Sequence, residues 1–283
     1  LTIDRFGEVL VAQATTAGME RRKDAITEAV VKVLKPRQLW WKNDASIRSL
    51  ENLPEYADLA LGEPIDAPLI VREAGLECEC NPVSGQKTGW FYDQRDNRDQ
   101  LARLVKGKRV LDMFSYLGGW GLRAARDGAS EVVCVDSSPA AVDAITRNAQ
   151  RNGLQDCVRA VRADAFDFLR NLREQRERFD VVILDPPAFV KRRKDLAEGR
   201  IAYRRLNELG MQVLERDGIL ITFSCSHHLP RSMLLDGVQQ AARHLDRQAQ
   251  MLVSMQQGPD HPVHPAIAET EYLKGFILRV LPA

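Results

Sequence analysis

The pattern of hydrophobic and polar positions divides the chain near residue 100 into two parts. In the first part, short apolar runs favour β-strands at residues 8–13, 38–42 and 69–79, the last of them interrupted by Gly75. Residues 20–34 repeat apolar side chains at helical spacing, and Pro36 ends that helix. Residues 52–68 hold three prolines and few apolar repeats, which indicates a loop. These features predict a small α+β domain, which we assign to residues 1–85.

The second part alternates between apolar runs and helical periods. It begins with a predicted bridging helix at residues 93–105. The alternation then predicts strands at residues 109–113, 131–135, 158–162, 179–184 and 218–223. It predicts helices at residues 119–127, 139–152, 165–177, 200–215 and 231–245. Strands separated by such helices need crossover connections, so we predict an α/β, doubly wound, mostly parallel sheet over residues 86–283.

Composition narrows the class of protein. Of the 283 residues, 45% are hydrophobic and 28% are charged, a balance typical of a globular chain of two domains. No segment approaches the roughly 18 apolar residues of a membrane span, and the N-terminus lacks the layout of a secretory signal. Five scattered cysteines are a poor disulfide framework, which favours a cytoplasmic location. The chain begins with Leu1, so we expect further residues upstream.

Acidic residues follow three consecutive predicted strands. Asp112 precedes a glycine-rich loop, Asp136 lies 24 residues later, and Asp164 follows the next strand. One such aspartate is more often a helix cap, but three would meet at the sheet edge where ligands bind. A carboxylate before the glycines would repel a pyrophosphate, and the glycines lack the spacing of nicotinamide-binding loops. The pattern instead favours S-adenosylmethionine, with Asp112 at its cationic amino-acid end, Asp136 at its ribose and Asp164 at its adenine.

The fourth strand is followed by Asp185, Pro186, Pro187 and Phe189. Two prolines stiffen this turn and remove backbone donors. The simplest interpretation is a rigid loop. Loops of this acid-plus-proline type are also common in methyltransferases that act on nitrogen-bearing rings, and Phe189 is available to stack on a planar base. We therefore expect this loop to receive the substrate base.

Cys225 follows the fifth strand. A free cysteine is most often a buried apolar side chain, but this one lies at the edge that carries the proline loop. A thiolate that adds to carbon 6 of a pyrimidine makes carbon 5 nucleophilic enough to be methylated, and Asp185 would hydrogen-bond the ring. The sequence does not identify the general base that then removes the carbon 5 proton, and His227 and His228 are the candidates. These histidines could also join His261 and His264 around a metal, but no ligand pattern supports that, and we predict no metal site.

A basic segment, residues 191–205, directly follows the proline loop. It contains seven cationic side chains and only two acidic ones, Asp195 and Glu198. A charge run alone is usually a solvated helix face, and the net charge of the chain is only +1. Beside a base pocket, however, such cations would hold phosphates, which favours an RNA partner. The cations are Lys191, Arg192, Arg193, Lys194, Arg200, Arg204 and Arg205.

Residues 86–98 (QKTGWFYDQRDNR) resemble the K-T-G-x-F-x-D-Q-R-x-N-R signature of the ribosomal RNA large-subunit methyltransferase I family. The glycine loop, the strand-end acids, the proline loop, the S-C-S segment around Cys225 and the tail at residues 260–275 follow the order of that family, so the resemblance covers essentially the whole chain. It implies a seven-stranded Rossmann-like methyltransferase sheet. It also implies formation of 5-methylcytosine in 23S rRNA, with S-adenosylmethionine as the methyl donor.

The resemblance also implies a set of site residues. Cys225 would be the nucleophile and Asp185 its pocket partner. From the proline loop and the basic segment themselves, we expect the base and the RNA to be bound by Pro186, Pro187, Phe189, Lys191, Arg192 and Arg193. The cofactor would be bound by Gln86, Phe91, Asp93, Arg95, Asp112, Phe114, Tyr116, Gly118, Asp136, Ser137, Asp164, Ala165 and Asp185. Residues 1–85 resemble the family's central module, which helps to hold RNA.

The chain departs from the family in one respect. Members usually begin with a PUA domain, and this chain starts where that domain would end. A sister family with the same signature methylates guanine N7 without a nucleophilic cysteine, so that target stays an alternative. Two further hypotheses are a methyltransferase of small molecules and a non-catalytic RNA-binding assembly factor. As partners we expect 23S rRNA or a large-subunit ribosomal particle, no membrane, and a second copy of the chain as an option.

Overall fold

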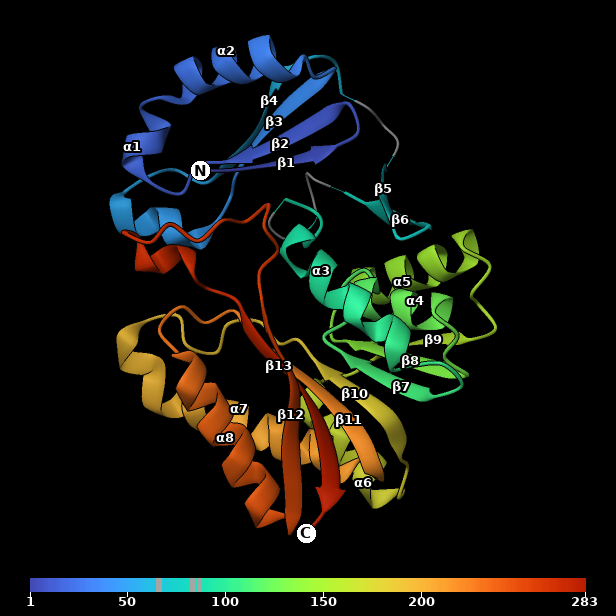
Figure 1. Cartoon of the computed structure of the whole chain (residues 1–283). Coiled ribbons are helices and arrows are strands. Elements are labelled where there is room, and N and C mark those ends of the chain that lie inside the picture. The colour runs from blue at the N-terminus through green and yellow to red at the C-terminus, as the bar shows by residue number, and fades with distance from the viewer. Residues whose placement is uncertain (65–67, 82–84, 86–87) are drawn as a thin grey trace. The chain divides into compact units, whose positions relative to one another are not determined.

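The computed structural model describes residues 1–64, 68–81, 85 and 88–283 (Figure 1). These residues form two compact units, Leu1–Phe91 and Tyr92–Ala283. In the described residues, no helix has the length and apolar character needed to cross a membrane.

The first unit contains a four-stranded sheet in the order β1-β2-β3-β4. Its helix α2 connects the parallel strands β2 and β3, and Ile26, Val30 and Val31 of that helix pack against the buried Leu10 and Trp41. A separate hairpin, β5-β6, completes the unit. The elements are β1 (Thr2–Phe6), β2 (Val9–Gln13), α1 (Ala17–Glu20), α2 (Lys23–Leu34), β3 (Gln38–Asn43), η1 (Ser46–Glu51), β4 (Tyr56–Leu61), β5 (Leu69–Glu73) and β6 (Leu76–Cys80).

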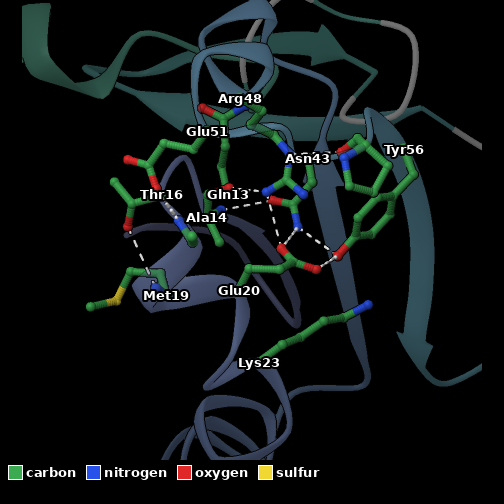
Figure 2. Close-up of polar contacts among 12 residues, drawn as sticks. Gln13, Ala14, Thr16, Met19, Glu20, Lys23, Asn43, Arg48, Glu51 and Tyr56 are labelled. Atoms are coloured by element: carbon green, nitrogen blue, oxygen red, sulfur yellow. Dashed lines mark hydrogen bonds and ion pairs between the residues drawn. The ribbon is translucent and has the colours of Figure 1, made fainter.

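Polar side chains form a network between α1, β3, η1 and β4 in this unit, as Figure 2 shows. Arg48, which is fully buried, donates to Glu20 over 3.0 Å and to the Pro54 carbonyl over 2.9 Å. The Tyr56 hydroxyl donates to Glu20 over 2.7 Å, and Asn43 donates to Tyr56 over 2.8 Å. The charge of the buried arginine is therefore compensated inside the unit.

The second unit contains a seven-stranded sheet in the order β12-β13-β11-β10-β7-β8-β9, in which β13 runs antiparallel to the other six strands. Helices α6, α7 and α8 share one core with one face of the sheet, while α4 and α5 pack on β7, β8 and β9 (Figure 1). This architecture confirms the predicted fold class.

The strands and helices of this unit follow the predicted alternation. The strands are β7 (Arg109–Met113), β8 (Glu131–Asp136), β9 (Val158–Arg162), β10 (Phe179–Leu184), β11 (Leu214–Ser224), β12 (Arg247–Gln256) and β13 (Lys274–Pro282). The α-helices are α3 (Arg95–Arg98), α4 (Gly119–Arg126), α5 (Pro139–Arg151), α6 (Ala165–Glu174), α7 (Leu196–Gln212) and α8 (Arg231–His244). Short 3-10 turns are η2 (Tyr92–Gln94), η3 (Asp99–Arg103), η4 (Arg193–Asp195) and η5 (Ala268–Thr270).

Two sequence predictions about elements were wrong, and a third was refined. The predicted loop at residues 52–68 contains β4, a half-exposed edge strand whose weak apolar alternation hides it in the sequence. The interruption predicted at Gly75 is the tight turn of the hairpin β5-β6, in which Ala74 and Gly75 adopt positive φ angles (51° and 78°). The bridging helix at residues 93–105 is divided into η2, α3 and η3.

Candidate functional site

The carboxyl ends of β11, β10, β7, β8 and β9 lie next to one another in that order, because these strands are parallel neighbours. The strand order reverses between β10 and β7, and in open α/β sheets ligands bind at such a switch point. The residues that follow these strands therefore share one edge of the sheet. In that order they are Cys225, Asp185, Phe114, Asp136 and Asp164.

The loop after β7 has an unusual backbone. Phe114, Tyr116 and Gly118 have φ angles of 63°, 51° and 86°, a left-handed region that costs energy for residues with a side chain. Asp136 stabilises this conformation, since one of its carboxylate oxygens accepts from Tyr116 N over 2.9 Å and the other from Ser138 N over 2.9 Å. The loop is thus held in a strained shape at the switch point, which is typical of a ligand-binding segment.

Asp112 lies beneath this loop and is fully buried. Its Oδ2 atom accepts from Gly121 N over 3.0 Å, while Oδ1 is buried without a hydrogen-bond partner among the described residues. Burial raises the pKa of Asp112 to about 7, and the charges of Asp185 and Asp136 act in the same direction. Hydrogen bonds from Ser115 and Gly121 lower the pKa of Asp112 but do not outweigh its burial. The edge therefore contains a buried acid whose charge the protein compensates only in part.

Asp164 is the N-cap of α6. Its Oδ1 atom accepts from Phe166 N over 2.9 Å and from Asp167 N over 3.1 Å. The capping interpretation of a strand-end aspartate therefore holds at this position. Of the two small residues predicted beside the acids, Ser137 is exposed and Ala165 is buried in the core under α6.

Asp185 is held by two donors that the sequence patterns did not single out. Its Oδ2 atom accepts from Trp120 Nε1 over 3.0 Å and from Gln94 Nε2 over 3.0 Å. Asn97 donates to Gln94 Oε1 over 2.7 Å and so fixes the amide of Gln94. A signal existed for both donors, because a tryptophan inside a glycine loop needs a partner for its N–H, and Gln94 lies within the 86–98 signature.

Cys225 contacts the proline loop. Its Sγ atom lies 3.9 Å from the Pro186 carbonyl oxygen. The neighbouring Ser226 Oγ accepts from Val190 N over 3.0 Å and lies 2.9 Å from the Tyr203 hydroxyl. These buried contacts join the turn after β11, the loop after β10 and helix α7, so the predicted nucleophile and the predicted base pocket adjoin.

Aromatic rings continue from the proline loop. The Phe189 ring lies 4.7 Å from the ring of Tyr203 and 6.3 Å from that of Phe166, between centroids. The guanidinium of Arg205 lies 5.7 Å from the centre of the Phe166 ring. Among the predicted base-binding residues, Pro187 is exposed, Phe189 is half-buried and Pro186 is buried. The seven cations of the basic segment, which extends through η4 into α7, are all exposed.

Other predicted residues have different partners. Asp93 accepts from the Tyr272 hydroxyl over 2.7 Å, and Arg95 pairs with Asp96 and with Asp260 at 3.4 and 3.5 Å. Phe91 ends the first unit, and Gln86 lies outside the described residues.

The histidines form no metal centre in the described ranges. No group of three or more potential ligands is found in residues 1–64, 68–81, 85 and 88–283. The rings of His227 and His228 lie 5.1 Å apart in the turn after Cys225. His261 instead contacts Asp260 at 3.1 Å.

The same fold occurs in solved structures. The crystal structure of SMU.776 complexed with SAH superimposes with a TM-score of 0.86 and 22% identity, over 98% of this chain and 70% of that chain. Trm5b from Pyrococcus abyssi superimposes with a TM-score of 0.71 and 17% identity, over 99% of this chain and 75% of that chain. At such identities the likeness shows the fold.

Sequence comparison identifies the family. The profile described as "Conserved hypothetical protein 95" matches residues 96–227. The ribosomal RNA large subunit methyltransferase I of Aeromonas hydrophila is 39% identical over 281 residues, which are 99% of this chain and 71% of that protein. The protein of the same name from Photobacterium profundum is 39% identical over 277 residues, 98% of this chain and 70% of that protein. The chain belongs to the ribosomal RNA large subunit methyltransferase I family.

Proposed function

We propose that this chain uses S-adenosylmethionine to form 5-methylcytosine in 23S rRNA, with Cys225 as the nucleophile. The observation that carries the proposal is the junction of two adjacent strand ends, where Cys225 Sγ lies 3.9 Å from the carbonyl oxygen of Pro186 in the Asp185 loop. The proposed substrate, large-subunit rRNA, is taken from the names of the relatives. A thiol at this place can activate a pyrimidine, and the family resemblance implies that the pyrimidine is cytosine.

The edge fits a cationic methyl donor. S-adenosylmethionine supplies an electrophilic methyl group on a positively charged sulfur and also carries an ammonium. The buried and only partly compensated carboxyl of Asp112 suits that positive charge and would reject a pyrophosphate. We assign the amino-acid end to Asp112, Phe114, Tyr116 and Gly118, with Asp185 close to the methyl group.

The rest of the cofactor would lie along β8 and β9. Asp136 already accepts two backbone N–H groups, but a carboxylate has about four lone-pair sites, so it can also accept both ribose hydroxyls beside Ser137. Asp164 would accept from the adenine amino group beside Ala165. Gln86, Phe91, Asp93 and Arg95 remain proposed supports of this pocket.

Residues of this chain would activate the cytosine ring. The Cys225 thiolate forms a bond to carbon 6 of cytosine, and the electron pair of the 5,6 double bond becomes available at carbon 5. Asp185, held by Trp120 and Gln94, would hydrogen-bond the ring and stabilise this adduct. After methylation, a base removes the carbon 5 proton, the double bond re-forms and the thiolate leaves. His227 and His228 remain the candidates for that base.

The exposed cations after the proline loop would bind the RNA backbone. Replacing Lys191, Arg192 and Arg193 with alanine should lower the dependence of RNA affinity on salt, by about 0.7–0.9 in log–log slope for each phosphate that is no longer bound. Arg126, an exposed cation on α4, serves as the matched control. We also propose that the first unit helps to hold the RNA.

The direct test replaces Cys225 with alanine and measures methyl transfer to 23S rRNA. The expected result is loss of turnover with SAH affinity unchanged by calorimetry. Cys157→Ala removes another partly buried thiol and should keep its activity. If Cys225→Ala still methylates RNA, the covalent mechanism is wrong, and nucleoside analysis of the product would distinguish guanine N7 from cytosine. If the wild-type chain binds no SAH, the non-catalytic hypothesis gains support.

A further inference from the structure

One buried lysine has no role in the proposed mechanism. Lys274 is the first residue of β13, pairs with Ser224 at the end of β11, and is only 5% exposed. It belongs to the tail segment that matches the family, yet the sequence suggests no function for it. A buried ammonium is costly unless its protons and charge are satisfied, so its contacts indicate its purpose.

The ammonium of Lys274 fixes the turn that carries Cys225. Its Nζ atom donates to the Ser226 carbonyl over 2.7 Å and to the Leu229 carbonyl over 2.9 Å. On its other side, the same turn is held through Ser226 Oγ by Tyr203 and Val190. Cys225 therefore lies on a short turn that is anchored from both β13 and α7.

Lys274 also interacts electrostatically with Cys225. Burial lowers the pKa of Lys274 to about 8, while the thiolate form of Cys225 acts to raise that pKa. The other charged groups that act on Lys274 are Arg231 at the start of α8 and Glu271 before β13, and Tyr203 of α7 interacts with Cys225. The attraction is mutual, so a protonated Lys274 favours the thiolate over the thiol.

We propose that Lys274 is a positioning residue for Cys225, which fixes the turn at residues 225–229 and holds the sulfur as the thiolate that adds to carbon 6. This inference rests on the proposed function, since only a nucleophilic Cys225 needs that help. A neutral donor could form the same two hydrogen bonds to the carbonyls. A purely structural role therefore does not require the positive charge of Lys274.

The test measures the pH dependence of Cys225 alkylation by iodoacetamide, a reaction in which the thiolate forms the sulfur–carbon bond and iodide leaves. Peptide mass spectrometry separates Cys225 from Cys157. Cys157 serves as the internal control, because it lies after α5, contacts the Ala129 carbonyl and is not among the groups that act on Lys274. In the wild-type protein the reactivity midpoint of Cys225 should lie below that of a free thiol, about 8.5. Lys274→Gln keeps the donors and removes the charge, and should raise the midpoint by about one pH unit. Lys274→Arg keeps the charge and should restore the wild-type profile.

The outcomes separate the two proposals, because alkylation needs no turnover. An unchanged midpoint in Lys274→Gln overturns the role of Lys274, as does a wild-type midpoint at or above 8.5. If Lys274→Gln does not fold, the wild-type midpoint and the Lys274→Arg profile still test the role of Lys274. If Cys225→Ala keeps its methyltransferase activity, the covalent mechanism fails even where the alkylation profile shifts as expected.

Discussion

Each unit contains an acid whose pKa the fold shifts, and the two shifts have opposite signs. In the first unit, burial acts to raise the pKa of Glu20, but hydrogen bonds from Tyr56 and Arg48 and the charge of Arg48 outweigh it and hold the pKa below its ordinary value (Figure 2). In the second unit, burial and two neighbouring acids raise the pKa of Asp112 to about 7. The carboxylate of Glu20 is paired with a cation, whereas that of Asp112 is compensated only in part, by hydrogen bonds.

This difference separates stability from function. A paired and hydrogen-bonded charge contributes to the folded state, whereas an uncompensated buried acid destabilises it unless a ligand supplies the opposite charge. The network around Glu20 would therefore be structural. The acids around Asp112 would form a binding site whose electrostatics become favourable when the cationic cofactor is bound.

The largest expected effect on this comparison comes from Arg48→Met. The change removes the cation that pairs directly with Glu20 and the donors to the Ala14 and Pro54 carbonyls, so the free energy of unfolding should fall by about 2 kcal/mol in urea denaturation. Arg72→Ala is the matched control, because it removes an ion pair whose side chains are 76% and 43% exposed and should cost at most about 0.5 kcal/mol. Equal effects of the two variants would refute the structural role of the Glu20 network.

Asp112→Asn should weaken ligand binding without lowering the stability of the protein. It removes the charge proposed to face the cofactor, so SAH affinity should fall about 30-fold, which corresponds to ~2 kcal/mol for a charge-assisted contact. The unfolding temperature at pH 8 should stay the same or rise, because a buried carboxylate is lost. Calorimetry and thermal unfolding of the same samples provide both values. A variant that loses stability and keeps its SAH affinity would reverse the assignment.

The pH dependence of SAH binding sharpens the comparison further. A bound ammonium favours the Asp112 carboxylate, so binding below pH 7 must first remove a proton from that group. The dissociation constant should rise by up to about tenfold for each pH unit below 7 and stay flat above about pH 8. Calorimetry from pH 5.5 to 9 measures this dependence. A profile that is flat through pH 7 would show that Asp112 does not face the ligand's charge.

The smallest effect concerns Glu20. Because its folded pKa lies below its ordinary value, the contribution of Glu20 to stability is present above the unfolded pKa of about 4.3 and is lost as pH falls through the folded value. Glu20→Gln should therefore lower stability at pH 7 and have less effect near pH 3. Urea denaturation at both pH values checks this, and an equal loss at the two would contradict it.

The sequence predicts the acids of the site better than their partners. Asp112, Asp136, Asp164 and Asp185 can be recognised because parallel strands deliver their carboxyl ends to one edge, so position along the chain implies position in space. Gln94, Trp120 and Lys274 escape this reasoning. Their contacts with Asp185 and with the turn after Cys225 depend on side-chain packing between elements that are distant in sequence.

Local structure shows the same limit. β4 is an edge strand, with β3 as its partner in the sheet. This pairing compensates for a weak apolar pattern, which sequence periodicity cannot reveal. Residues 93–105 have helical composition but divide into short turns, and there Gln94 and Asn97 make tertiary hydrogen bonds instead of covering a surface helix. The errors thus fall where long-range contacts override local propensity.

The most direct test of the account uses 23S rRNA transcribed with 5-fluorocytidine in place of cytidine. Fluorine at carbon 5 takes the place of the proton that must leave, so the thiolate cannot depart and a covalent protein–RNA adduct should accumulate in the presence of S-adenosylmethionine. Peptide mass spectrometry should locate the adduct at Cys225, and Cys225→Ala should form none. Turnover on natural rRNA together with no adduct, or an adduct at another residue, would contradict the account.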